Sequence, residues 1–339
     1  MYQSSQHIFT LSYLLAISTI SRAADDIGTC VDVECPVVPN SSAANCIVAN
    51  QTFTSIGIVD YSVPITEGGL DLSWTLGIDD QILESDQYQR EVERVLYLGT
   101  SPDVDLTSKD LDYFGCGFYI TLPDNDNVVF EPNRTDSLSP ACGDVLGNQC
   151  TLNLGTDLVS NAIEIARNSL DSVANQATTC SSIASAVQSN FPSSCTITSP
   201  QVHGFPLTGA GAAKPISASE NSTSNCHPTI PRSNQLTRVA SYKISASVYY
   251  NETAPAILGE TPVMSFFWKQ DGSNSSLIQS PSVNFQCLFA SPMTTVGNNT
   301  MTNNGTDDDI NGASERYGAG FGVLSTVALA AFLLTCGIV

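Results

Sequence analysis

The stretch LDLSWTL at residues 70–76 places leucine or tryptophan at every second position, with Asp, Ser and Thr between them. This period of two predicts a β-strand with one buried face. Comparable patterns, several of them rich in β-branched and aromatic residues, predict further strands at 56–63, 91–98, 114–121, 242–250, 263–269 and 283–289. The chain is therefore expected to contain strands on both sides of its middle.

The middle of the chain changes to helical spacing. Steps of three and four residues predict one helix of about 20 residues, with an apolar stripe at Val159, Ile163, Ala166, Leu170, Val173 and Ala177. A second, shorter helix is predicted over 180–190, with Ile183 and Val187 on one side. Pro192 ends it. The predicted fold class is α+β: a mostly antiparallel β-sheet or sandwich, stapled by disulfides, with an inserted helical hairpin packed on one side.

Both ends of the chain resemble processing signals. Residues 1–23 are typical of a secretory signal peptide, because an apolar stretch precedes Ser21-Arg22-Ala23, with small residues at positions −3 and −1. The apolar segment 317–339 follows small residues and a spacer, which is typical of a glycosylphosphatidylinositol (GPI) attachment signal. A transmembrane helix is the alternative. Asn311 is the preferred attachment residue, and the other candidates are Asn304, Gly305, Gly312 and Ser314.

The glycosylation sequons and the cysteines are consistent with a chain that is exported from the cell. Asn-x-Ser/Thr sequons begin at Asn40, Asn50, Asn133, Asn221, Asn251, Asn274, Asn298 and Asn304, and each predicts a surface position in a secreted protein. Outside the tail, ten cysteines allow up to five disulfides: Cys30, Cys35, Cys46, Cys116, Cys142, Cys150, Cys180, Cys195, Cys226 and Cys287. Sequence does not fix their pairing, although Cys142–Cys150 and Cys180–Cys195 are sterically easy. Zinc is disfavoured, because no paired CxxC or Cys/His spacing occurs.

Four segments follow from these features. Residues 1–23 are the signal peptide, 24–290 the disulfide-bonded ectodomain, 291–311 a glycosylated Ser/Thr/Asn-rich stalk and 312–339 the GPI-attachment propeptide. Within the ectodomain, Gly, Ala, Ser, Pro and Thr dominate residues 205–234, which predicts a long surface loop tied down by Cys226.

Charge excludes one class of partner. The chain has 12 Lys+Arg against 33 Asp+Glu, a formal net charge of −21, so a basic face for nucleic acid is ruled out. Residues 24–171 hold 25 acidic and 5 basic side chains, which predicts an acidic face. Asp103 to Asp112 contain closely spaced carboxylates, but an EF-hand loop would need Gly and Glu where Ser108 and Phe114 stand. An irregular calcium site is left open.

The sequence nominates no catalytic, cofactor-binding or metal-ligating residue. A G-x-S-x-G elbow is missing, and the mature chain has two histidines, His203 and His227, which are expected to be exposed loop side chains. Carboxylates are abundant but fall in no glycosidase signature: Asp79, Asp80, Glu84, Glu91, Glu93, Asp124 and Asp126.

Aromatic side chains are the remaining candidates. Core packing is the default for them, and the set comprises Trp74, Tyr97, Tyr113, Phe118, Tyr119, Tyr249, Tyr250, Phe266, Phe267 and Trp268. Neighbours in a strand point to opposite faces, so one member of 249–250 and one of 266–268 are candidates for an exposed ligand-binding aromatic.

The stretch YLGTSPDVDL at 97–106, leading into FGCGFYI at 114–120, resembles a segment of uncharacterised secreted ascomycete proteins. The layout of the whole chain resembles that of fungal GPI-anchored cell-surface glycoproteins. This resemblance implies a place on the outer face of the plasma membrane or in the cell wall, held by the GPI lipid. It also implies a non-enzymatic role in adhesion, wall organisation or partner recognition, with wall polysaccharide or surface proteins as partners. The alternatives are a carbohydrate-active enzyme using a carboxylate pair and an acidic module that binds cations or small ligands.

Overall fold

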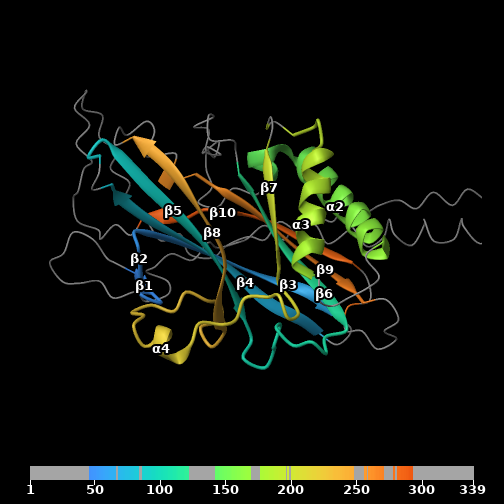
Figure 1. The fold of residues 1–339 in the computed structure, drawn as a ribbon, viewed down its shortest axis with the longest axis horizontal. Coiled ribbons are helices and arrows are strands. Elements are labelled where there is room, and N and C mark those ends of the chain that lie inside the picture. The colour runs from blue at the N-terminus through green and yellow to red at the C-terminus, as the bar shows by residue number, and fades with distance from the viewer. Residues whose placement is uncertain are drawn as a thin grey trace, which may run out of the picture. The chain divides into compact units, whose positions relative to one another are not determined.

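The computed structural model describes residues 46–65, 68–83, 86–121, 142–168, 176–195, 197, 200–247, 256–257, 259–270, 278 and 281–292. In this part the chain forms two larger sheets, a small hairpin and a group of helices (Figure 1). Every strand pairing is antiparallel. The predicted α+β class, with mostly antiparallel sheets, is confirmed.

The larger sheet has five strands in the order β11-β3-β4-β5-β8. Their bounds are Ser291–Pro292 for β11, Ser55–Ile65 for β3, Gly68–Ile82 for β4, Gln89–Thr100 for β5 and Gln235–Ser247 for β8. The stretch at 70–76 lies in β4, the central strand. Strand β8 comes from the part of the chain after residue 171, and it pairs with β5 from the acidic part at 24–171, so both parts build one sheet.

The smaller sheet has four strands in the order β10-β9-β6-β7. Their bounds are Ser282–Leu288 for β10, Thr261–Lys269 for β9, Tyr113–Thr121 for β6 and Gln201–Pro206 for β7. The predicted strands at 114–121, 263–269 and 283–289 are confirmed. Strand β7 was not predicted. Its Gly204 lets a helix approach closely, since an added Cβ would lie 2.3 Å from the carbonyl oxygen of Cys180.

The two sheets face each other across an apolar core. The five-stranded sheet contributes buried side chains such as Leu72, Trp74 and Leu96, and the four-stranded sheet contributes Tyr113 and Phe267. The next residues along β6 and β9, such as Phe118 and Phe266, point to the other side of the smaller sheet. Both faces of this sheet are therefore buried, and the sandwich prediction is confirmed.

Helices cover the outer face of the smaller sheet. A π-helical turn at Gly143–Gly147 leads into α2 (Asn148–Asn168), and α3 (Gln176–Ser189) lies beside β7 (Figure 1). The predicted helical hairpin on one side is confirmed, but its bounds were wrong. Helix α2 begins before the predicted stripe, because Cys150, Leu154 and Leu158 already face the sheet, and Ala177 belongs to α3.

A further layer covers the outer face of the five-stranded sheet. It consists of the hairpin β1 (Cys46–Val48) and β2 (Gln51–Phe53), together with residues 216–234, which include the short helix α4 (Ala218–Asn221). We call it the cover layer. Ser73 and Thr75 on β4 are fully buried beneath it, so the expectation of one exposed face was wrong for these residues. The prediction of a long surface loop at 205–234 was also wrong, because its first two residues belong to β7 and because Thr208 and Thr229 are fully buried.

Four disulfides lie within the described residues. Cys116–Cys180 joins β6 to α3, Cys142–Cys287 joins the start of the helices to β10, Cys150–Cys195 joins α2 to the segment after α3, and Cys46–Cys226 closes the cover layer. The suggested local pairs Cys142–Cys150 and Cys180–Cys195 were wrong, because Cys142 and Cys180 lie against strands of the sheet. Cys30 and Cys35 lie outside the described residues.

A buried polar trio fixes how the two sheets face each other. Trp74 on β4 donates its Nε1 hydrogen to Ser265 Oγ on β9 over 3.0 Å, and Ser265 Oγ also hydrogen-bonds the Tyr61 hydroxyl on β3 at 2.7 Å. Burial raises the pKa of Tyr61 above its ordinary value, so this hydroxyl stays protonated. Trp74 and Ser265 are 0 % exposed, and no water can replace a lost partner.

Replacing Ser265 with alanine should lower the free energy of unfolding by about 2 kcal/mol, since a buried indole N–H and a buried hydroxyl lose their common partner. Urea denaturation measures this change. The matched control is Ser245→Ala at an exposed position of β8, expected to change stability by less than about 0.5 kcal/mol. Equal effects of the two variants would contradict a role of the trio in stability.

Candidate functional site

A cavity of about 160 Å³ lies where β5, β7 and β8 end or begin. The last residues of strand β5 line one side of it, and residues 102–107 of the following loop line another. The C-terminal end of β7 also contributes to the wall. The chain between β7 and β8 completes the wall. The lining residues are Leu98, Thr100, Pro102, Val104, Asp105, Leu106, Thr107, Pro206, Leu207, Ala213, Pro215, Gln235, Thr237 and Val239.

The wall of the cavity is apolar with a few polar groups. Leu98 and Leu207 are buried, and Val239 is half-buried. Thr100 lies opposite Gln235 in the pairing of β5 with β8, and Thr237 lies opposite Leu98, so three polar side chains enter from neighbouring positions. This mixture of apolar wall and few polar groups is typical of small-molecule sites.

Asp105 is an exposed carboxylate at this cavity. Its Oδ1 accepts hydrogen bonds from the Thr107 hydroxyl at 2.7 Å and from the Thr107 backbone N–H at 2.9 Å. These bonds, the hydroxyl one most, lower the pKa of Asp105 below its ordinary value. The group is therefore ionised at neutral and mildly acidic pH. It is the only carboxylate among the described residues that line the cavity.

The neighbouring acidic residues do not assemble a metal centre. In the ranges that the structure describes, which include residues 103–112, no three His, Cys, Asp or Glu side chains group closely enough to hold a metal ion. The irregular calcium site that the sequence left open is thus not found there.

The acidic residues of β4 and β5 face partners on neighbouring strands. Glu93 accepts from Arg238 at 2.8 Å and Glu91 from Lys243 at 2.5 Å, and both bases lie on β8. Asp79 lies directly opposite Glu93, and the Gln51 side-chain amide donates to both carboxylates, at 3.3 and 3.1 Å. These carboxylates stabilise the sheet rather than line a cleft. Glu84, Asp124 and Asp126 lie outside the described residues.

Asp80 gives the fold a pH dependence. Its side chain is 8 % exposed and pairs with Arg90 at 2.9 Å. Burial raises the pKa of Asp80 more than Arg90 lowers it, so the folded-state pKa lies above the unfolded one. The stability that this group contributes is present below the unfolded pKa and is lost as the pH rises through the folded pKa.

Replacing Asp80 with asparagine removes this titration. The variant should therefore gain stability relative to the natural protein between about pH 3 and about pH 7. Urea denaturation of both proteins at the two pH values measures the difference in unfolding free energy. A difference that stays constant or reverses would contradict the raised pKa of Asp80.

The two histidines have structural partners. His203 was expected in an exposed loop but lies half-buried in β7, where its ring stacks on Tyr119 with centroids 4.5 Å apart. Its Nε2 lies 3.1 Å from Thr121 Oγ1, and burial lowers the pKa of His203. His227 Nε2 hydrogen-bonds the backbone oxygen of Asn234 at 2.7 Å. No hydrogen bond in the described part joins either imidazole to a carboxylate, as a triad would require.

The aromatic candidates are core residues wherever the structure describes them. The proposal that 266–268 exposes one aromatic was wrong, because β9 is covered on both faces and all three side chains are buried. Tyr249 and Tyr250 lie outside the described residues. The other candidates are buried in the same way: Trp74, Tyr97, Tyr113, Phe118 and Tyr119.

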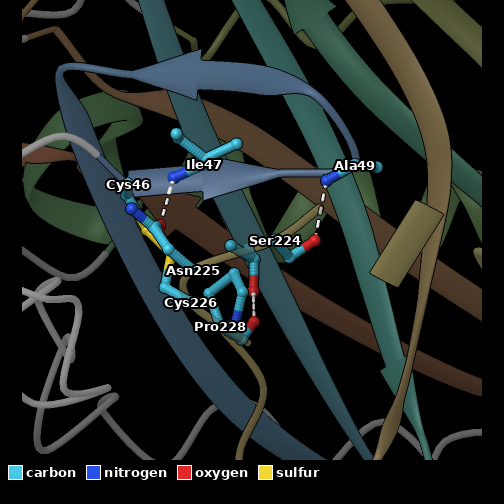
Figure 2. The surroundings of a disulfide bond; sticks show 8 residues. Cys46, Ile47, Ala49, Ser224, Asn225, Cys226 and Pro228 are labelled. Carbon is cyan, nitrogen blue, oxygen red and sulfur yellow. Dashed lines mark hydrogen bonds between the residues drawn. A yellow bond between two sulfur atoms is a disulfide. The ribbon is translucent and has the colours of Figure 1, made fainter. Parts of the chain in front are cut away.

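Two sequons lie in the described part, and both asparagines are exposed. Asn50 occupies the β1–β2 turn with a φ of 67°, and Asn221 ends α4. Figure 2 shows how the hairpin is attached: Ile47 N–H donates to Asn225 Oδ1 at 2.6 Å and Ala49 N–H to Ser224 Oγ at 2.9 Å, beside Cys46–Cys226. Both sequons therefore belong to the cover layer. The other six, and Asn311, lie outside the described residues.

No protein-family model matches this chain, and no curated protein or solved structure is significantly similar to it. Among the described helices, none has both the length and the apolar composition needed to cross a membrane. Sequence reasoning missed the cavity. Its signal was present in the Thr-Ser-Pro-Asp-Val-Asp turn at 100–105, but that turn also suits an ordinary exposed loop.

Proposed function

We propose that this chain is an exported glycoprotein, tethered outside the plasma membrane by a GPI lipid at Asn311, which acts in adhesion, wall organisation or partner recognition. One observation carries the proposal: the described residues hold four disulfides, which link the helices to the smaller sheet and to each other and close the cover layer. Disulfides of this density persist in oxidising compartments and are rare in the cytosol.

The exposed sequons support the same route. An N-glycan needs an asparagine that reaches solvent, and both Asn50 and Asn221 do so at the edge of the cover layer. Because both residues are exposed, glycans there would leave the fold intact. The apolar segment 317–339, preceded by small residues, supports the GPI tether.

A recognition role is favoured over hydrolysis by what the carboxylates do. Glu91, Glu93 and Asp80 are held in ion pairs within the sheet. Among the described residues that line the cavity, Asp105 is the one carboxylate, whereas a glycosidase needs two carboxyl groups about 5 to 9 Å apart. A sandwich with disulfide-linked helices, carried on a Ser/Thr/Asn-rich stalk, is suited to presenting a surface to a partner.

The test is expression of the full chain in a yeast, with an epitope tag placed after Ala24. Phosphatidylinositol-specific phospholipase should release the tagged protein from membranes, and a variant lacking 317–339 should appear in the medium without the enzyme. Asn50→Gln and Asn221→Gln should each remove the mass of one glycan. Protein that stays in the membrane after the enzyme, or that carries no glycan, would contradict the proposal.

A further inference from the structure

The cavity between β5, β7 and β8 has the size of a small-molecule site. Its volume of about 160 Å³ is close to that of an engineered cavity that binds benzene. Its occupant therefore has about six non-hydrogen atoms. This scale excludes a disaccharide or a peptide segment from entering it fully.

Its wall selects an occupant with an aliphatic body. Leu98, Leu207 and Val239 contribute branched side chains, and Pro102 and Pro206 add ring methylenes. No aromatic ring lines the cavity among the described residues, so stacking on a sugar or a base is not offered there. An aliphatic chain would gain the most from this surface by leaving water.

The polar groups of the cavity have capacity for a ligand. In the described part of the chain, the side chains of Thr100, Gln235 and Thr237 make no hydrogen bond to another residue, and none of their polar atoms is sealed from solvent. Both bonds from Thr107 go to Oδ1 of Asp105, which leaves acceptor capacity on Oδ2. Thr107 therefore orients the Asp105 carboxylate at the cavity, and the carboxylate keeps its negative charge for a ligand.

Charge completes the selection. Asp105 is the carboxylate of this cavity, and the chain as a whole carries a net charge of −21, which raises the local concentration of cations. A cationic group on the ligand is attracted to this negative charge. Its N–H groups can donate hydrogen bonds to a carboxylate and to threonine hydroxyls. A primary ammonium group provides three such donors.

We propose that this cavity binds a short-chain aliphatic ammonium ion, with the ammonium group at Asp105 and the chain against Leu98, Leu207 and Val239. The site goes beyond the proposed surface function and does not depend on how the chain is anchored. Binding is non-covalent and needs no co-reactant.

The test uses mature protein purified from cells that express the full chain, with isopentylammonium as the probe and isopentanol as its neutral counterpart. Ligand-observed NMR titration near pH 6.5 should show millimolar binding of the ammonium ion and about tenfold weaker binding of the alcohol. Failure of the ammonium ion to bind, or equal binding of the two probes, would overturn the proposal.

Variants locate the site. Asp105→Asn keeps an acceptor for Thr107 and should weaken ammonium binding about tenfold, whereas Asp103→Asn, in the same loop but not lining the cavity, should leave it unchanged. Val239→Phe should abolish binding by filling the cavity, and Ala213→Leu at the half-buried lip provides a second filling variant if the first is unstable. Unchanged binding in Asp105→Asn or in a folded filling variant would overturn the assignment.

Discussion

Replacing Cys46 and Cys226 together with serine should lower the free energy of unfolding by about 4 kcal/mol. The two cysteines are 180 residues apart in sequence, and Cys116–Cys180 shortens the effective loop to roughly 120 residues. A loop of that length still loses much conformational entropy in the unfolded chain when it is closed. The variant should also loosen the cover layer, because β1 and β2 form a hairpin too small to be stable alone.

Guanidinium denaturation under non-reducing conditions measures this loss. Asn225→Ala is the matched control, because it removes the side-chain bond to Ile47 but keeps the disulfide, and it should cost about 1 kcal/mol. Hydrogen exchange should be faster at Val48 and Phe53 in the double variant than in the control. Equal stability of the double variant and the natural protein would contradict the structural role of this bridge.

Replacing Arg94 with methionine should lower the free energy of unfolding by about 3 kcal/mol. Arg94 on β5 is 0 % exposed and donates to the backbone oxygens of Ala256 and Gly259, each at 2.8 Å, and to Thr261 Oγ1 at 2.7 Å. It therefore ties the five-stranded sheet to the start of β9. The variant leaves buried acceptors without a donor, and relief from burying a charge offsets only part of this cost.

The control for Arg94 is Arg238→Met on the neighbouring strand β8. Arg238 is about half exposed and pairs with Glu93, so its loss should cost less than about 1 kcal/mol. Urea denaturation of both variants at neutral pH gives the comparison. A smaller effect at Arg94 than at Arg238 would show that the buried guanidinium does not hold the two sheets together.

The fold class could be predicted from the sequence because apolar and polar residues alternate along a strand wherever one face of the sheet is more apolar than the other. Leu70, Leu72 and Trp74 reveal β4 in this way. The short strands β1, β2 and β7 could not be found, because a stretch of three to six residues is too short to show a period. The helix bounds were misplaced because the exposed Leu152 lies between Cys150 and Leu154 and blurs the apolar stripe that they begin.

Tertiary contacts explain what else the sequence could not supply. Local cysteine pairs are easy to imagine, but Cys180 faces β6 and Cys142 faces β10, positions that depend on how helices pack on the sheet. The cavity likewise joins residues near 100, 206 and 237, which no motif links. Buried polar positions such as Ser265 and Arg94 also read as ordinary strand residues until their partners are known.

The central claim is that the mature protein ends in a GPI lipid, and mass spectrometry of its C-terminal peptide tests this most directly. After protease digestion of protein purified from membranes, the account predicts a last peptide that ends at Asn311 and carries ethanolamine phosphate, with nothing recovered from 317–339. An unmodified peptide that continues to Val339 would contradict it.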